Sequence, residues 1–265
     1  MTGFLTVAEL DAFSGVVVDC RFSLADETTG AREYSLGHIP DARYLGLAED
    51  MSAEVAVHGG RHPLPSPPKF ASKLAALGIG PDTDVALYDD SRFVFAARCW
   101  WMMRALGYRE PSLLNGGYAA WLAQGGTPDT SSPVIQASAL PAIPDEWPGC
   151  CGREQLATLQ GQSAVLVDAR EGPRYRGEHE PIDPIAGHIP GAINLPWQSF
   201  STQDGIFLEV AALRGCWGAT LEASPLVVYC GSGVSACVNL LSLAMLGRDD
   251  VILYGGSWSD WCSYL

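Results

Sequence analysis

Short apolar runs rich in valine recur along the chain and alternate with longer amphipathic stretches. Runs of this length are typical of buried parallel strands, and they cover residues 16–18, 85–87, 165–167 and 226–228. Helices are expected at residues 68–77, 93–106 and 236–246. Strands that alternate with helices predict an α/β fold whose mainly parallel sheet carries helices on both faces. In such sheets ligands bind beyond the carboxyl ends of the strands.

The pattern of apolar and polar positions occurs twice. VVVDCR at 16–21 returns as VLVDAR at 165–170, and GHIPDA at 37–42 returns as GHIPGA at 187–192. Self-similarity over this length indicates two tandem copies of one fold.

A proline-rich stretch separates the two copies. Its prolines disfavour helix and sheet interiors and favour an extended linker. We therefore expect a first domain at residues 1–127, a linker at 128–149 and a second domain at 150–265.

Composition narrows the classes of partner. Hydrophobic residues make up 48% of the 265 residues, which is enough for a sizeable core. Thirty acidic and sixteen basic residues give a net charge of −14, which excludes nucleic acid and anionic membrane as expected partners. No apolar run reaches the ~18 residues of a membrane helix, and no targeting signal is recognisable, so we expect a cytoplasmic protein.

The eight cysteines show no Cys-x-x-Cys spacing, so neither a metal site nor a thioredoxin-like motif is expected. Most of them should be buried packing groups, Cys237 among them. Cys150 and Cys151 lie beside the linker, and no role is assigned to them.

Residues present in both copies are expected to be scaffold. The Asp-x-Arg after each first strand predicts a local ion pair, and the histidine of each Gly-His-Ile-Pro predicts a hydrogen-bonded structural group. These residues are Asp19 with Arg21, Asp168 with Arg170, His38 and His188.

The copies differ where the third strand of each ends. The first reads YDDSRFV at 88–94 and the second reads YCGSGVS at 229–235. Glycines allow the backbone to approach a bound group closely, and such a turn before a helix forms an anion site. A thiolate is stabilised in that position, which predicts that Cys230 is a nucleophile.

Three kinds of cysteine chemistry place the nucleophile in a loop, and each makes its own demand on the residues around it. A phosphatase loop needs an arginine six positions after the cysteine, where this chain has Ala236. A papain-like nucleophile does not fit a strand–loop–helix setting. A sulfur carrier fits, because its thiolate takes up a sulfane sulfur as a persulfide and needs neither a metal nor a cofactor.

With these features the chain resembles the two-domain rhodanese-like sulfurtransferases over essentially its whole length. The resemblance rests on the repeat, the linker, the motif at 187–190, the loop at 230–235, and Asp89 in a first, inactive copy. The loop itself is similar to that of the 3-mercaptopyruvate sulfurtransferases.

The resemblance implies a role for each residue of the loop. Cys230 is the expected nucleophile and persulfide carrier, and Ser232 is expected to bind the thiolate or relay a proton. The backbone N–H groups that would hold the transferred sulfur belong to Gly231, Ser232, Gly233, Val234 and Ser235.

Residues outside the loop are implied as well. Arg174 matches the arginine that grips the donor's carboxylate or sulfonate, and His62 is expected either to contact substrate or to pack its own loop. Two positions depart from the family pattern: Ile182 stands where mercaptopyruvate enzymes often have a second arginine, and Gly46 stands where some members have an aspartate.

The expected function is transfer of sulfane sulfur from a small anionic donor, with 3-mercaptopyruvate favoured, to a thiol, thioredoxin or cyanide. Two alternatives remain at this point. One is a thiosulfate:cyanide sulfurtransferase, and the other is a persulfide carrier that lacks efficient small-molecule turnover.

Overall fold

The computed structural model describes residues 3–265 and divides the chain into two compact units. The first unit contains the chain up to Ala53, Pro65–Pro148 and Gln203–Phe207. The second contains Glu54–Leu64, Gly149–Thr202 and Leu208–Leu265. Each unit thus includes a short segment whose neighbours in the sequence belong to the other unit.

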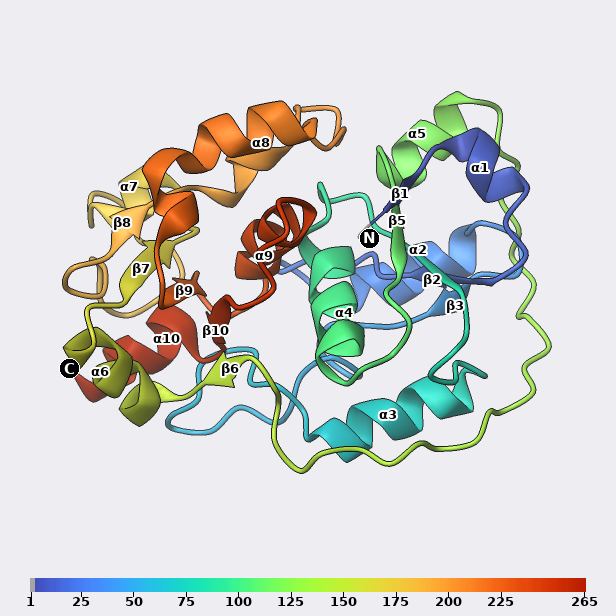
Figure 1. Cartoon of the computed structure of the whole chain (residues 1–265). Helices are drawn as coiled ribbons and strands as arrows, with labels where there is room; N and C mark the ends of the chain where they lie inside the picture. Colours follow the sequence, from blue (N-terminus) through green and yellow to red (C-terminus); the bar gives the residue numbers. More distant parts are fainter. Residues whose placement is uncertain (1–2) are drawn as a thin grey trace. The chain divides into compact units, whose positions relative to one another are not determined.

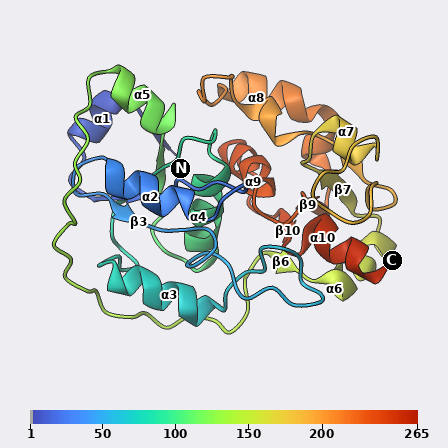
Figure 2. The ribbon, with the colours of Figure 1, turned by 180° about the vertical axis from the view of Figure 1, so that it is seen from behind.

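The first unit is built on a parallel five-stranded sheet in the order β1-β5-β4-β2-β3 (Figure 1). Its strands are β1 (Phe4–Leu5), β2 (Val16–Asp19), β3 (Arg43–Tyr44), β4 (Val85–Tyr88) and β5 (Ser112–Leu114). Its helices are α1 (Val7–Asp11), α2 (Thr29–Leu36), α3 (Pro67–Ala76), α4 (Val94–Ala105) and α5 (Gly117–Ala123). Helix α4 is drawn in front of α2 in Figure 1 and behind it in Figure 2, so the two helices cover opposite faces of this sheet.

The second unit repeats this plan with the strand order β6-β10-β9-β7-β8, again all parallel. Its strands are β6 (Cys150–Cys151), β7 (Val165–Asp168), β8 (Ile193–Asn194), β9 (Leu226–Tyr229) and β10 (Ile252–Tyr254). Its α-helices are α6 (Arg153–Gly161), α7 (Gly172–Tyr175), α8 (Val210–Trp217), α9 (Ala236–Met245) and α10 (Ser257–Trp261). Three 3₁₀ turns complete it: η1 (Trp197–Phe200), η2 (Gly218–Glu222) and η3 (Cys262–Tyr264).

The predicted fold class is confirmed, and the three predicted helices appear as α3, α4 and α9, each within about one residue of its predicted bounds. The proline-rich stretch at 128–149 is mostly exposed and contains neither a helix nor a strand. It is also anchored within the first unit, because Trp147 donates from Nε1 to the carbonyl of Pro65 (2.6 Å) and Asp129 pairs with His38.

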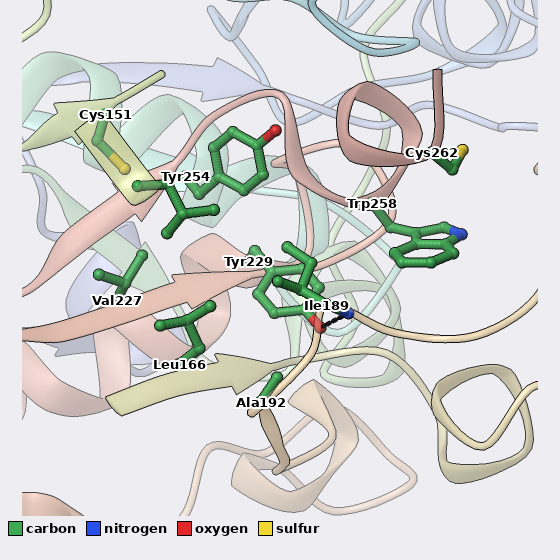
Figure 3. Close-up of a cluster of buried hydrophobic side chains, with 10 residues drawn as sticks. Cys151, Leu166, Ile189, Ala192, Val227, Tyr229, Tyr254, Trp258 and Cys262 are labelled. Carbon is green, nitrogen blue, oxygen red and sulfur yellow. Dashed lines mark hydrogen bonds between the residues drawn. The ribbon is translucent and has the colours of Figure 1, made fainter. Parts of the chain in front are cut away.

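The valine-rich strands are buried between the helices and form the core of each unit. In the second unit, Leu166 and Val227 pack with Tyr229, Tyr254 and Trp258 (Figure 3). The hydroxyl of Tyr229 accepts a hydrogen bond from the N–H of Ile189 (3.1 Å), drawn as a dashed line in Figure 3. This contact ties the Gly-His-Ile-Pro turn to the strand that leads into the cysteine loop.

The repeated polar residues are scaffold in both units. Each arginine of an Asp-x-Arg motif forms a buried ion pair with its aspartate at 2.6 Å and donates to the carbonyl before the next histidine at 2.7 Å. Each histidine binds a carbonyl through Nδ1 and stacks on a tyrosine ring. The pairs are Arg21 with Asp19, Arg170 with Asp168, His38 with Tyr34 and His188 with Tyr175.

Candidate active site

Cys230 lies at the carboxyl end of the central strand β9, where the sequence pattern predicts a ligand site. The first two residues of α10 hold its backbone: the N–H of Cys230 donates to Oγ of Ser257 (3.1 Å), and its carbonyl accepts from the N–H of Trp258 (3.0 Å). The residue is 2% exposed. A buried sulfur on a fixed backbone is suited to reaction with a small substrate.

The loop after Cys230 presents backbone donors that the chain itself does not use. Within residues 3–265, no group accepts a hydrogen bond from the N–H of Gly231, Ser232, Val234 or Ser235. Gly233 has φ +77°, which turns the loop toward α9. Several N–H groups at the start of a helix are suited to bind an anion, and the anion site at this loop stays a prediction.

The equivalent loop of the first unit shows what such a cradle binds. Asp89 occupies the position of Cys230, and its carboxylate accepts hydrogen bonds from four backbone N–H groups at 2.9–3.0 Å. The donors are Ser91, Phe93, Phe95 and Ala96. Burial raises the pKa of Asp89, against the four hydrogen bonds, which lower it. The repeated loop therefore binds an anion supplied by its own chain in the first unit.

Ser232 and His62 meet beside Cys230. Nδ1 of His62 lies 2.8 Å from Oγ of Ser232. His62 belongs to the segment Glu54–Leu64, which packs in the second unit. This segment is anchored by the N–H of Gly59, which donates to Asp260 (2.7 Å). The structure thus places His62 on the cysteine loop, and the contact is made to Ser232.

Arg174 lies near the loop but is also committed to two carboxylates. Its Nη2 lies 2.7 Å from Oε1 of Glu180 and 3.1 Å from Oδ2 of Asp183. Burial by itself raises the pKa of Glu180, but hydrogen bonds from Arg174 and from two backbone N–H groups outweigh it and lower that pKa. A Cβ built on Gly231 would lie 3.5 Å from both terminal nitrogens of Arg174. The arginine is therefore held in one orientation beside the residue that follows Cys230.

The guanidinium of Arg61 also lies beside Gly231, and the sequence did not predict this. Its Nη2 lies 3.1 Å from the position of a Gly231 Cβ, and its Nη1 pairs with Asp183. The sequence offers no local signal for this position, because Arg61 is one basic residue in an irregular segment.

Two positions depart from the family pattern. The side chain of Ile182 is 47% exposed. Gly46 lies in the first unit, where its N–H donates to Asp50 (2.9 Å).

The remaining cysteines carry no chemistry in this site. All eight thiols are free of disulfide bonds. Cys237 is fully buried at the start of α9, with Sγ 3.5 Å from the carbonyl of Gly233, as expected of a packing group. Over residues 3–265 there is no cluster of three or more His, Cys, Asp or Glu side chains able to hold a metal ion.

Comparison with known proteins identifies the family of the chain. Residues 6–124 and 153–264 both match the rhodanese-like domain, and the chain belongs to that family. A Pseudomonas aeruginosa protein named "Probable 3-mercaptopyruvate sulfurtransferase" is 44% identical over 255 residues, covering 93% of this chain and 88% of the relative. Bovine thiosulfate sulfurtransferase is 34% identical over 260 residues, covering 92% and 84%.

A solved structure shows the same arrangement. The 3-mercaptopyruvate sulfurtransferase from Leishmania major matches with a TM-score of 0.89 and 28% identity, over 100% of this chain and 75% of that one. The protein is accordingly a sulfurtransferase, an enzyme that moves sulfur from a donor to an acceptor. None of its helices within residues 3–265 is both long and apolar enough to span a membrane.

Proposed function

We propose that this enzyme takes sulfur from 3-mercaptopyruvate onto Cys230 and passes it from the persulfide to a thiol, thioredoxin or cyanide. The observation that carries this choice of donor is the hydrogen bond between Ser232 and His62 beside an anion cradle that the chain leaves unfilled.

The first half-reaction moves one sulfur atom and one proton. The Cys230 thiolate attacks the sulfur of 3-mercaptopyruvate, an S–S bond forms, and the C–S bond breaks with its electron pair on the donor's methylene carbon. The thiol proton of the donor ends on that carbon, which gives pyruvate and the Cys230 persulfide anion. The N–H groups of Gly231, Ser232, Val234 and Ser235 are available to stabilise that anion.

A proton must therefore travel from sulfur to carbon within the donor. The Ser232 hydroxyl and the His62 imidazole are joined at 2.8 Å, and this pair takes up the proton and returns it. Thiosulfate makes no such demand, because sulfite leaves as an anion and no proton moves. A partly buried acid–base pair on the cysteine loop thus favours mercaptopyruvate over thiosulfate.

The second half-reaction returns the enzyme to its starting state. An acceptor attacks the outer sulfur of the persulfide, the S–S bond breaks, and Cys230 leaves as thiolate. Cyanide gives thiocyanate and a thiol gives a hydropersulfide. The site needs only to admit the acceptor, which is why several acceptors are compatible with it.

The test is steady-state sulfur transfer to cyanide from each donor, with Cys230→Ser as the variant and Cys216→Ser as the control. Cys216 is half-buried, and its Sγ lies 3.5 Å from the carbonyl of Ser199 in the same unit. We expect kcat/KM to favour 3-mercaptopyruvate, with turnover lost in Cys230→Ser and kept in Cys216→Ser.

Two other outcomes are informative. A preference for thiosulfate that is lost in Cys230→Ser would keep the nucleophile and overturn the proposed donor. A Cys230 persulfide that mass spectrometry detects without turnover of either donor would indicate a persulfide carrier.

A further inference from the structure

Two guanidinium groups converge on the residue that follows the proposed nucleophile. A Cβ at Gly231 would lie 3.1 Å from Nη2 of Arg61 and 3.5 Å from Nη1 and Nη2 of Arg174. Arg174 belongs to α7, whereas Arg61 comes from the segment Glu54–Leu64. A Cβ at position 231 would crowd Arg61 and touch Arg174 at ordinary contact distance, so glycine there leaves room for both arginines.

A single buried carboxylate joins the two arginines. Asp183 pairs with Nη1 of Arg61 through Oδ1 and with Nη2 of Arg174 through Oδ2 (3.1 Å), and its side chain is 1% exposed. Glu180 accepts hydrogen bonds from Nε and Nη2 of the same Arg174 side chain. The acidic groups thus fix one edge of each guanidinium and leave the other edge facing Gly231.

Uncommitted donors remain on the edge that faces the loop. Within residues 3–265, no group accepts a hydrogen bond from Nη2 of Arg61 or from Nη1 of Arg174. The Arg61 side chain is 28% exposed, so a small molecule that enters from solvent can reach it. Two guanidinium edges with free N–H groups are suited to a carboxylate, which accepts paired charge-assisted hydrogen bonds.

We propose that Arg61 is the second half of the donor's anion site and binds, together with Arg174, the carboxylate of the α-keto acid donor beside Cys230. This inference rests on the proposed function and adds a residue that determines substrate affinity. Position 182, where mercaptopyruvate enzymes often have a second arginine, holds Ile182 in this chain. Arg61 would supply that second positive charge from the segment Glu54–Leu64.

The surroundings of Arg61 argue against a purely structural role for its guanidinium. Its segment is already anchored by the N–H of Arg61 on Oγ of Ser259 (3.1 Å), by Gly59 on Asp260, and by His58, which stacks on Tyr264 at 3.8 Å. The guanidinium is not required to attach the segment. The backbone hydrogen bonds of the segment and the ion pair with Asp183 instead place the guanidinium beside Gly231.

The experiment compares Arg61→Gln with Arg176→Gln as a matched control. Arg176 is an exposed arginine two residues beyond Arg174 that pairs with Glu178 at 2.7 Å, so its loss changes the net charge equally without touching Gly231. Two quantities are measured: kcat and KM for 3-mercaptopyruvate, and the dissociation constant of pyruvate by ligand-observed NMR. Arg61→Lys serves as a second variant if Arg61→Gln fails to fold.

We expect Arg61→Gln to raise both KM and the pyruvate dissociation constant about tenfold, the loss expected for one charge-assisted hydrogen bond, and to change kcat less. Arg61→Lys keeps the positive charge but loses the paired N–H donors of the guanidinium, so its effect on both constants should be intermediate. Arg176→Gln should leave both constants unchanged. Adding Ile182→Arg to Arg61→Gln should restore part of the lost affinity, because the exposed position 182 lies next to Asp183.

Constants within about twofold of wild type in Arg61→Gln, or an equal effect in Arg176→Gln, would overturn the role of Arg61. The same holds if the wild-type enzyme binds no pyruvate. A wild-type enzyme that does not turn over 3-mercaptopyruvate contradicts the proposed function alone, since the pyruvate dissociation constants still decide the role of Arg61.

Discussion

Nδ1 of His62 lies 2.8 Å from Oγ of Ser232, although 170 positions separate the two residues in the chain. The proposed reaction uses this contact only when a proton must reach the donor's carbon. Ser232→Ala should therefore lower kcat with 3-mercaptopyruvate by about 100-fold, as is usual for loss of an acid–base group, and should affect thiosulfate much less. Steady-state rates with both donors measure the difference.

The partner residue provides the control for this prediction. His62→Asn should lower the mercaptopyruvate rate by a similar factor, and the double variant should be little worse than either single one, because the two groups act as a unit. An equal loss with both donors would instead indicate that Ser232 serves to shape the loop.

Gly231 is predicted to be intolerant of a methyl group. In Gly231→Ala the new Cβ would lie 3.1 Å from Nη2 of Arg61, closer than an ordinary carbon–nitrogen contact, so the arginine must move. We expect KM for the donor to rise severalfold with little loss of stability. In the control Gly215→Ala, the added Cβ meets no atom within 4 Å in α8, and the better helix former should raise stability by about 1 kcal/mol.

Asp89 is expected to be important for the stability of the first unit. Asp89→Ala leaves four backbone N–H groups without their acceptor, and we expect a loss of about 3 kcal/mol in the free energy of unfolding by urea. The neighbouring Asp90 is exposed, so Asp90→Ala should cost less than about 0.5 kcal/mol. Similar values for the two variants would contradict the role of the cradle.

Glu180 is expected to make the stability of the fold depend on pH in the acid range. Its folded-state pKa is lowered from the ordinary value of 4.5, so its carboxylate stabilises the fold above pH 4.5, and this contribution is lost as pH falls through the folded-state pKa. Glu180→Gln should be less stable than wild type at pH 7, and the difference should shrink toward pH 3. Urea unfolding at a series of pH values measures it.

The control for Glu180 is an exposed ion pair. Glu178→Gln breaks the pair with Arg176, whose side chains are both more than half exposed, and solvent screening makes such pairs weak. A pH-dependent loss as large as that of Glu180→Gln would show that burial near Arg174 adds nothing.

Much of the fold was predictable because the chain repeats itself. A repeated strand motif, a repeated Gly-His-Ile-Pro turn and valine-rich strands were enough to predict two parallel sheets. The loop at 230–235 differed from its copy in residue type, which singled out Cys230, whereas the role of Ser232 was implied by the family resemblance. These are local signals, in which neighbouring residues carry the information.

The rest depended on tertiary placement. Arg61 stands next to His62 in the sequence, yet no local pattern shows that its guanidinium reaches Gly231. Nor does the sequence show that Arg174 and Arg61 both pair with Asp183. The donor site predicted from the sequence therefore contained Arg174 but not Arg61. Asp89 was recognised as the counterpart of Cys230, but its four N–H contacts follow only from the folded backbone.

The short segment Glu54–Leu64 has a consequence for any attempt to divide the protein. It carries Arg61 and His62 into the second unit, while the residues on either side of it in the sequence belong to the first. A polypeptide that begins at Gly149 would keep Cys230 and its loop but lack both side chains. The two copies of the fold are thus no longer interchangeable modules: the half without the cysteine has become the source of two residues that we assign to sulfur transfer.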